Sequence, residues 1–475
     1  MKPDFDLTPG ERSELLEYLA AELELFYART ESFRVTPDLD LERVIRAVRS
    51  HDLESPVEGH KALRSVLSGM TEYAVHTPHP MYYGLFNPRA NFAGILADLI
   101  TAVLNPQLAA WSHSPYASEV EKYLVEVFGS AFGYPEEGVD GVFASGGAEA
   151  NFTAILCALN HAFPKAGSDG LRALEKQPII YCSPETHHSI VKGARMAGLG
   201  ARAVRMVPAD QRLRMKADQL ESMIRKDRDS GLEPIMVVAT AGTTGTGTID
   251  PIRECGEVSQ KHGLWYHVDA AYGGACIVDR EMKEWLGGIE SSDSLIVDLH
   301  KWFSVPMAAS LFLTRDPDIL HQTFGIHTDY MPGDARSLQI TDPFTHSFQW
   351  SRRFTGLKIY LSLLMFGMEG YSRVIRDQVD TGHFLRNCLE QNRWKIMNET
   401  PLPVVCFTDE TLGQDPGFAR EICDSVVQTG EAWISVYPVN RVQTLRACIT
   451  NYNTGENHIR ELVRLLGSIR DEYKN

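Results

Sequence analysis

The sequence predicts an α/β protein with a mostly parallel sheet in a large domain, a helical segment before it and a small α+β domain after it. Three observations lead to this prediction. The chain has 475 residues, which is too long for one ordinary hydrophobic core. Apolar strand-like segments alternate with helical ones over residues 91–355, the pattern of a sheet covered by helices on both faces. Residues 356–475 instead group helices before and between their strands, which indicates a separate small domain.

Residues 1–90 are predicted to be helical. Thr8-Pro9-Gly10-Glu11 has the pattern of a capping box with proline at the first helical position. Leu15, Leu19 and Leu23 then recur at helical spacing, so the helix has an apolar face. An isolated amphipathic helix cannot bury that face alone. It therefore packs either on its own chain or on a second copy.

The strands predicted for the large domain are short apolar runs. They cover residues 142–144, 179–181, 203–207, 235–239, 264–268, 295–297 and 310–313. Asp250, Pro251 and Gly263 are predicted to cap, begin and end one of the intervening helices. Ligands bind beyond the carboxyl ends of the strands in sheets of this kind, so the active site is expected there.

The small domain is predicted to contain four helices and three strands. The helices cover residues 361–374, 377–392, about 415–430 and a terminal stretch, and the strands cover 404–407, 433–436 and 444–449. The terminal helix carries its apolar residues on one stripe, which predicts a buried face. The residues of this stripe are Ile459, Leu462, Val463, Leu466 and Ile469.

Composition excludes several classes of partner. A formal net charge of −16 argues against binding to nucleic acid or to an anionic membrane. The apolar run at residues 92–111 contains Asp98 and an Asn105-Pro106 break, so it is predicted to be a buried helix and not a membrane span. The N-terminus has no apolar signal segment. The eight cysteines form no CxxC pair, which predicts reduced thiols in a cytoplasmic protein and no metal site.

Two predicted strands end in residues of complementary chemistry. Residues 295–297 lead to His300-Lys301-Trp302, and residues 264–268 end in Asp269-Ala270-Ala271. A lone lysine after a strand is most often a solvated surface charge. A lysine and a carboxylate at one sheet edge are also the pair that pyridoxal 5′-phosphate requires, because the amine forms a Schiff base and the carboxylate pairs with the pyridinium nitrogen. This chemistry alone leaves a decarboxylase, a transaminase or another lyase open.

These two stretches resemble the group II pyridoxal-phosphate-dependent decarboxylases, the family of aromatic-L-amino-acid and glutamate decarboxylases. The resemblance also includes His79-Pro80-Met81-Tyr82-Tyr83-Gly84 and extends to about residue 450. It implies fold type I, pyridoxal 5′-phosphate as cofactor, and decarboxylation of an L-amino acid or a carrier-bound derivative to the amine through a quinonoid intermediate. It further implies a cytoplasmic homodimer in which the N-terminal helices pack across the twofold axis and the two subunits share the active site.

The resemblance assigns roles to residues along the chain. The turn around Gly147 would cradle the phosphate at a helix N-terminus, and His187 would lie on the pyridine face. The implied cofactor-binding residues are Ser145, Gly147, Ala148, His187, Thr243, Thr244, Asp269, Ala271, His300 and Lys301, and the implied substrate-binding residues are Tyr83, Phe86, His113 and Arg446. Without the resemblance, each of these features has an ordinary explanation. The glycine turn is typical of a loop, and His187 is typical of a loop or capping histidine. Arg446 is typical of an arginine on the face of a strand.

Two departures from the family pattern concern catalysis. Asp298 stands where asparagine is usual. Family decarboxylases carry a tyrosine on a loop that should fall within residues 328–350 and that protonates the substrate Cα. Pro343 or Phe344 stands at its position, and Tyr330 is thirteen residues before Pro343.

Two outcomes follow from the missing tyrosine, and a separate hypothesis remains beside them. His346 or His187 supplies the proton and the product is the amine, since imidazole titrates near neutrality. Alternatively, oxygen-dependent decarboxylation and deamination gives an aldehyde, ammonia and peroxide, as in family members with phenylalanine there. A third possibility is a non-catalytic homologue that scaffolds a partner. The presence of Lys301, Asp269, His187 and Arg446 together argues against it.

Overall fold

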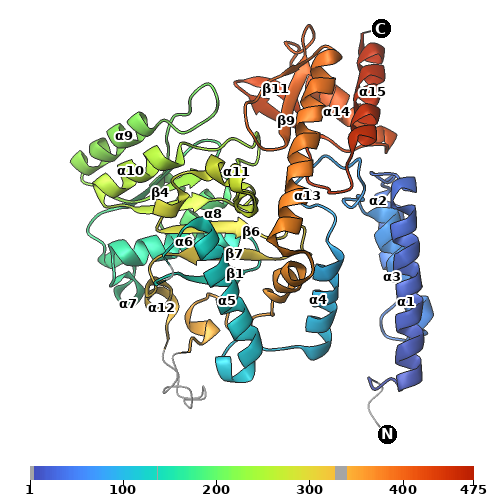
Figure 1. Ribbon diagram of the computed structural model, residues 1–475, viewed down its shortest axis with the longest axis horizontal. Helices are drawn as coiled ribbons and strands as arrows, with labels where there is room; N and C mark the ends of the chain where they lie inside the picture. The colour runs from blue at the N-terminus through green and yellow to red at the C-terminus, as the bar shows by residue number, and fades with distance from the viewer. Residues whose placement is uncertain (1–4, 136, 327–339, 475) are drawn as a thin grey trace.

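The computed structural model describes residues 5–135, 137–326 and 340–474. Figure 1 shows a large sheet with helices on both faces, a small sheet with its own helices near the C-terminus, and helices α1–α3 along one edge of the molecule. No helix in these described ranges is both long and apolar enough to cross a bilayer.

Within the described residues, seven strands form the large sheet in the order β1-β7-β6-β5-β4-β2-β3. Strands β3, β2, β4, β5 and β6 are parallel, whereas β7 runs antiparallel to both of its neighbours, which confirms a mostly parallel sheet. Each corresponds to a predicted strand. Their bounds are β1 (Asp140–Ala144), β2 (Pro178–Cys182), β3 (Val204–Met206), β4 (Glu233–Thr240), β5 (Trp265–Asp269), β6 (Ser294–Asp298) and β7 (Ser310–Thr314).

Alternate residues of these strands enter two separate cores. Val142 and Val238 pack in one core, and their neighbours Phe143 and Val237 pack in the other. This alternation is the period of two expected of strands buried on both faces. The helices on the first face include α6 (Gly147–Ala162), α7 (Ala166–Asp169), α8 (Ser189–Met196) and α12 (Ile319–Phe324), and those on the second include α5 (Pro115–Phe132), α9 (Ala217–Asp229), α10 (Ile252–His262) and α11 (Arg280–Lys283).

The start of α10 corrects one prediction. Gly263 ends the helix in the left-handed region at φ 61°, as predicted. Asp250 does not cap it, because Pro251 occupies the N-cap position. The Asp250 carboxylate instead accepts hydrogen bonds from the backbone N–H groups of Met215 and Thr240, at 2.7 and 2.8 Å. Burial raises the pKa of Asp250 to about 6.

The small domain has a sheet with the strand order β10-β11-β9-β8. Its strands are β8 (Trp394–Ile396), β9 (Val404–Asp409), β10 (Ser435–Val439) and β11 (Val442–Cys448). The domain also contains helices α14 (Phe418–Thr429) and α15 (Glu456–Tyr473). The predicted stripe of α15 is buried, and β8 was not predicted. The two helices predicted over 361–392 form α13 (Leu357–Gln391), interrupted at Gly367 with a non-helical φ of 64°.

The N-terminal helices are α1 (Pro9–Arg29), α2 (Leu41–Val48) and α3 (Gly59–Tyr73). The predicted capping box is confirmed, since the Thr8 hydroxyl accepts from the Glu11 N–H and the Glu11 carboxylate accepts from the Thr8 N–H. In the described part of this segment none of the three helices contains a buried residue. Leu16 is 56% exposed, so packing on its own chain leaves much of the apolar face uncovered.

Helix α4 (Phe92–Leu104) was predicted to be buried, and that prediction is half wrong. Ala93 and Ala97 are buried on the side that packs along α13. On the other side, Val103 and Leu104 are 74% and 73% exposed. An apolar face of this kind on a surface helix is typical of a protein interface.

Candidate active site

A cavity of about 190 Å³ lies at the carboxyl ends of the parallel strands, where the sequence predicted the active site. Lys301 comes from the turn after β6, Asp269 from the end of β5, and His187 from the loop after β2. The start of α6 also lines the cavity. Eight of the residues predicted for the site line this cavity together: Phe86, Gly147, Ala148, His187, Thr244, Asp269, Ala271 and Lys301.

Four predicted cofactor or substrate residues do not line this cavity. The Ser145 N–H and hydroxyl both donate to the Glu149 carboxylate, at 2.9 and 2.5 Å. The buried Thr243 hydroxyl accepts from a backbone N–H within its own turn at 3.0 Å. The buried His300 imidazole contacts the carbonyl oxygen of Ala309 at 2.8 Å. Tyr83 is fully buried, and its hydroxyl lies 3.5 Å from a methionine sulfur.

His113 and His346 are separated from the lysine within one chain. His113 is exposed to solvent. His346 lines a different cavity, where its Nε2 lies 3.1 Å from the Asp140 carboxylate. Tyr330 and most of the predicted loop lie outside the described residues. Phe344 is buried in the short helix Pro343–Thr345.

Arg446 is buried and donates to the backbone. Its guanidinium donates to the carbonyl oxygens of Gly84, Thr244 and Gly245 at 3.0, 2.7 and 2.8 Å. The same group lies 5.2 Å from the centre of the Phe86 ring. Arg446 therefore fixes two backbone segments at the cavity wall. Its contact with a substrate carboxylate stays a prediction.

Asp298 is the ion-pair partner of the lysine. The Lys301 Nζ lies 2.9 Å from the Asp298 Oδ2, and the Asp298 carboxylate is 3% exposed. The Ser310 hydroxyl donates to its other oxygen. A Cβ atom on Gly147 would lie 2.8 Å from the Asp298 Oδ2, closer than Cβ contacts are found. Position 147 therefore requires glycine, and the start of α6 can approach this side of the cavity closely.

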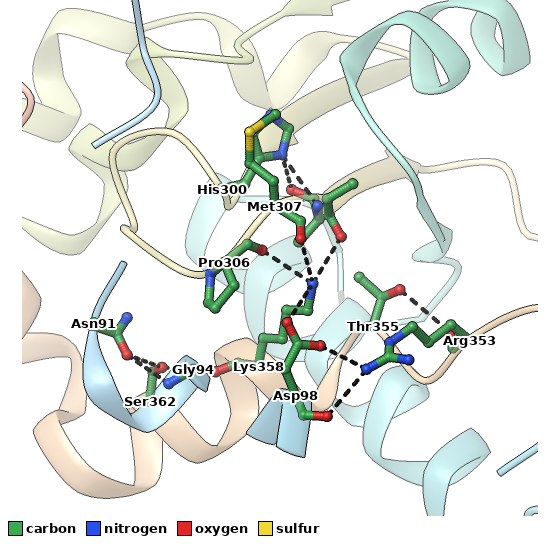
Figure 2. A network of polar contacts seen from close by, with 12 residues as sticks. Asn91, Gly94, Asp98, His300, Pro306, Met307, Arg353, Thr355, Lys358 and Ser362 are labelled. Carbon is green, nitrogen blue, oxygen red and sulfur yellow. Dashed lines mark hydrogen bonds and ion pairs between the residues drawn. The ribbon is translucent and has the colours of Figure 1, made fainter. Parts of the chain in front are cut away.

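A second lysine holds the loop that follows Lys301 (Figure 2). The Lys358 Nζ, from α13, donates to the carbonyl oxygens of Pro306, Met307 and Ala308 at 3.1, 3.2 and 3.3 Å. It also lies 3.4 Å from the Asp98 carboxylate of α4. Burial lowers the pKa of Lys358. The loop is thus anchored to two helices distant in sequence.

Asp269 is held by residues that the sequence analysis did not single out. The Asn151 Nδ2 donates to the Asp269 Oδ2 and to the Ser189 hydroxyl, both at 2.9 Å. Behind it, the His267 Nε2 lies 3.0 Å from the Asn151 Oδ1. On the cavity side, the Ser189 hydroxyl lies 2.8 Å from the His187 Nδ1. Strand alternation could have identified His267, because it lies two residues before Asp269 on the same face.

The two histidines of this network are held neutral. Full burial lowers the pKa of His267 to about 3. Loss of water around the imidazole at the cavity wall lowers the pKa of His187, while the nearby Asp269 carboxylate opposes the shift. At neutral pH each ring therefore has one N–H donor and one acceptor nitrogen.

These groups fit pyridoxal 5′-phosphate. The N–H groups of Gly147 and Ala148, at the start of α6, would hold the phosphate. Lys301 supplies the amine, and Asp269 supplies a buried carboxylate for the pyridine nitrogen. The Tyr272 hydroxyl, on a residue lining the cavity, is buried and has no hydrogen-bond partner among the described residues. The cavity thus offers an amine, an anion site and a ring-pairing carboxylate.

Comparison with known proteins gives concordant matches. A family model described as the pyridoxal-dependent decarboxylase conserved domain matches residues 54–409. The chain is 27% identical to 4-hydroxyphenylacetaldehyde synthase of Rhodiola rosea, over 87% of this chain and 86% of that protein. It is 26% identical to tryptophan decarboxylase 2 of Oryza sativa subsp. japonica, over 86% and 83%. The crystal structure of mouse CSAD in apo form matches with a TM-score of 0.90 and 26% identity, over 97% and 99%.

We expect Lys358→Met to lower the free energy of unfolding by about 2 kcal/mol, because three carbonyl oxygens lose their donor. Cofactor affinity should fall as well, since the loop after Lys301 loses its anchor. Urea denaturation and cofactor titration measure the two effects. Lys176→Met is the control, because Lys176 forms an exposed pair with Glu233 that contributes about 1 kcal/mol or less. Equal losses in both variants would contradict this assignment.

The buried His267 predicts a loss of stability in acid. Its pKa is about 3 in the folded protein and 6.5 ordinarily, so between these values the unfolded chain binds a proton that the folded chain does not. Stability therefore falls as the pH is lowered. Between pH 7 and pH 5 this residue accounts for about 2 kcal/mol. Urea denaturation of the cofactor-free protein at pH 7 and at pH 5 measures this effect. The free energy of unfolding should fall by about 2 kcal/mol more in wild type than in His267→Gln. Equal decreases in the two proteins would rule the prediction out.

Proposed function

The chain belongs to the pyridoxal-dependent decarboxylase family, and on that basis we propose that it decarboxylates an L-amino acid to the corresponding amine. The observation that carries the proposal is the convergence of Lys301, Asp269 and His187 on one cavity beside the N-terminus of α6. The family assignment makes the chain a pyridoxal-phosphate-dependent carboxy-lyase. The proposal concerns which residues act and which product forms.

The residues of the cavity have distinct roles in this proposal. When bound, pyridoxal 5′-phosphate supplies a ring that accepts the electron pair left when a bond to the substrate Cα breaks. Lys301 would bind the cofactor covalently, and Asp269 would keep the pyridine nitrogen protonated. The N–H groups of Gly147 and Ala148 would hold the phosphate. His187 would lie over the ring with Ala271 on the other face.

A second product outcome is favoured by the position of Phe344. The segment 340–350 contains no tyrosine, and Phe344 lies buried against the Trp350 ring at 4.8 Å. Without a proton donor at this position, the substrate Cα would react with oxygen. One O2 and one water would be consumed per amino acid, and one aldehyde, CO2, ammonia and hydrogen peroxide would form. Relatives of both kinds, decarboxylases and aldehyde synthases, are similar to this chain.

We also propose that two copies associate through the N-terminal helices and α4, and that they share the site. The support is the apolar surface of these helices, on which Leu16, Val103 and Leu104 are more than half exposed. A second copy would cover this surface. In such a dimer, His113 and His346 of each chain would lie near the cavity of the other chain. Neither histidine lines the cavity of its own chain.

A cytoplasmic location is part of the proposal. All eight cysteines lie within the described residues as buried free thiols. Burial raises the pKa of several of them, including Cys157, to about 12. Thiols that are kept protonated and buried in this way suit a reducing compartment.

Product analysis tests the reaction. Purified holoenzyme given a panel of L-amino acids should release CO2 and amine in equal amounts, in air and under argon. Lys301→Ala should release neither. Aldehyde and peroxide formed in equal amounts and only in air would establish the second outcome and refute amine formation. If neither the amine nor the aldehyde formed from any of the L-amino acids, both proposed outcomes would be overturned.

The dimer proposal predicts the effect of a charge on α4. Wild type should sediment at twice the chain mass of 53.1 kDa. Val103→Asp should raise the dissociation constant at least about tenfold, because a carboxylate would replace an apolar contact of about 2 kcal/mol. Met196→Asp, on the exposed side of α8, is the control and should remain dimeric. A monomeric wild type would refute the proposal.

A further inference from the structure

A continuous chain of buried hydrogen bonds runs behind the cavity from β5, by way of β6, to the loop after β2. It begins at the Trp265 indole, which donates to the Ser294 hydroxyl at 2.9 Å. The Ser294 hydroxyl lies 2.8 Å from the His267 Nδ1. His267 then contacts Asn151, which reaches both Asp269 and Ser189. Each of these side chains is at most 4% exposed.

The local geometry explains why these groups meet. Trp265, His267 and Asp269 are alternate residues of β5, so they lie on the same face of the sheet. Ser294 lies directly opposite His267 in the register of β5 and β6. Helix α6 packs on this face and places Asn151 one turn after its first residue, Gly147.

The carboxylate determines the direction of every hydrogen bond in the chain. Ionised Asp269 can only accept, so the Asn151 side that faces it must be the NH2 group. The Asn151 oxygen then faces His267, whose Nε2 must carry the proton and donate. The His267 Nδ1 is left as an acceptor for the Ser294 hydroxyl, which in turn accepts from the indole N–H. Every donor in this branch meets an acceptor.

The other branch reaches the catalytic histidine. The second N–H of Asn151 donates to the Ser189 hydroxyl, which then donates to the His187 Nδ1. The Ser189 backbone N–H points to the same nitrogen at 3.2 Å. Two donors on Nδ1 leave the single proton of neutral His187 on Nε2. His187 can therefore donate a hydrogen bond at Nε2 and cannot act there as a base.

We propose that Asn151 is a positioning residue that orients the Asp269 carboxylate and fixes the His187 tautomer with its two N–H groups, and that His267 holds Asn151 in this orientation. The inference rests on the cofactor assignment of the proposed function. It does not depend on whether the amine or the aldehyde forms. It assigns functional roles to two residues that need not touch the cofactor themselves.

The tautomer is tested on the cofactor-free protein by ¹⁵N NMR with labelled histidine, with the His187 signals assigned from their loss in His187→Gln. Wild type should show an unprotonated Nδ1 and a protonated Nε2. In Asn151→Leu the Ser189 hydroxyl becomes free to accept, so a measurable Nδ1-protonated fraction should appear. An Nδ1-protonated wild type, or an unchanged tautomer in Asn151→Leu, would overturn the tautomer assignment even if the enzyme is fully active.

Cofactor titration tests whether Asn151 and His267 orient the Asp269 carboxylate for cofactor binding. Asn151→Leu should weaken binding of pyridoxal 5′-phosphate at least about tenfold, the change expected when a charged group loses one hydrogen bond. His267→Leu should weaken it too, while His267→Gln, which retains an N–H for the Asn151 oxygen, should restore affinity to within about threefold of wild type.

Asn451→Leu is the matched control. Asn451 is as buried as Asn151, at 1% exposure, but it donates to the carbonyl oxygen of Pro78 and does not line the cavity. It should lower the melting temperature without changing cofactor affinity. Equal affinities in His267→Leu and His267→Gln would show that His267 only fills space. An Asn151→Leu affinity within twofold of wild type would refute the role of Asn151.

Discussion

The buried carboxylate of Asp269 and the groups that donate hydrogen bonds to it constrain the centre of this protein. Asp269 is 3% exposed, and a buried charge without donors would cost several kcal/mol. Asn151 and the backbone N–H of Ala271 supply those donors. The same helix that provides Asn151 begins at Gly147, where the phosphate is proposed to bind. One helix therefore contributes to both ends of the proposed cofactor site, and its register relative to β5 sets the distance between them.

The lysine side of the cavity depends on different parts of the chain. Lys301 follows β6 directly, but its loop is held by Lys358 of α13 and Asp98 of α4. Helix α4 also presents the exposed Val103 to the surface proposed to bind a second copy. The loop after Lys301 is thereby connected, through Lys358 and Asp98, to the helix that presents this surface. Asp298 completes this side as a charge partner for the lysine.

The residues assigned to the product outcome lie apart from this rigid centre. His346 and Phe344 belong to a segment next to α5 and β1. A single chain thus holds the groups that are proposed to act on the cofactor ring. The groups proposed to decide what happens to the substrate Cα are supplied elsewhere, which agrees with a site completed by association. This division fits a family whose members share a cofactor and differ in product.

The sequence by itself determined the sheet and the cofactor. Strand alternation, turn glycines and a lysine after an apolar strand depend on neighbours in the chain, so the sequence also predicted Lys301 and Asp269 at the ends of buried strands, where the structure places them on one cavity. The roles of Asp250 and Asp298, and the hydrogen-bond chain through Asn151 and His267, were decided only by the tertiary structure. A carboxylate or an amide can bond to any group that folding brings within 3 Å, and the sequence does not say which distant residue that will be.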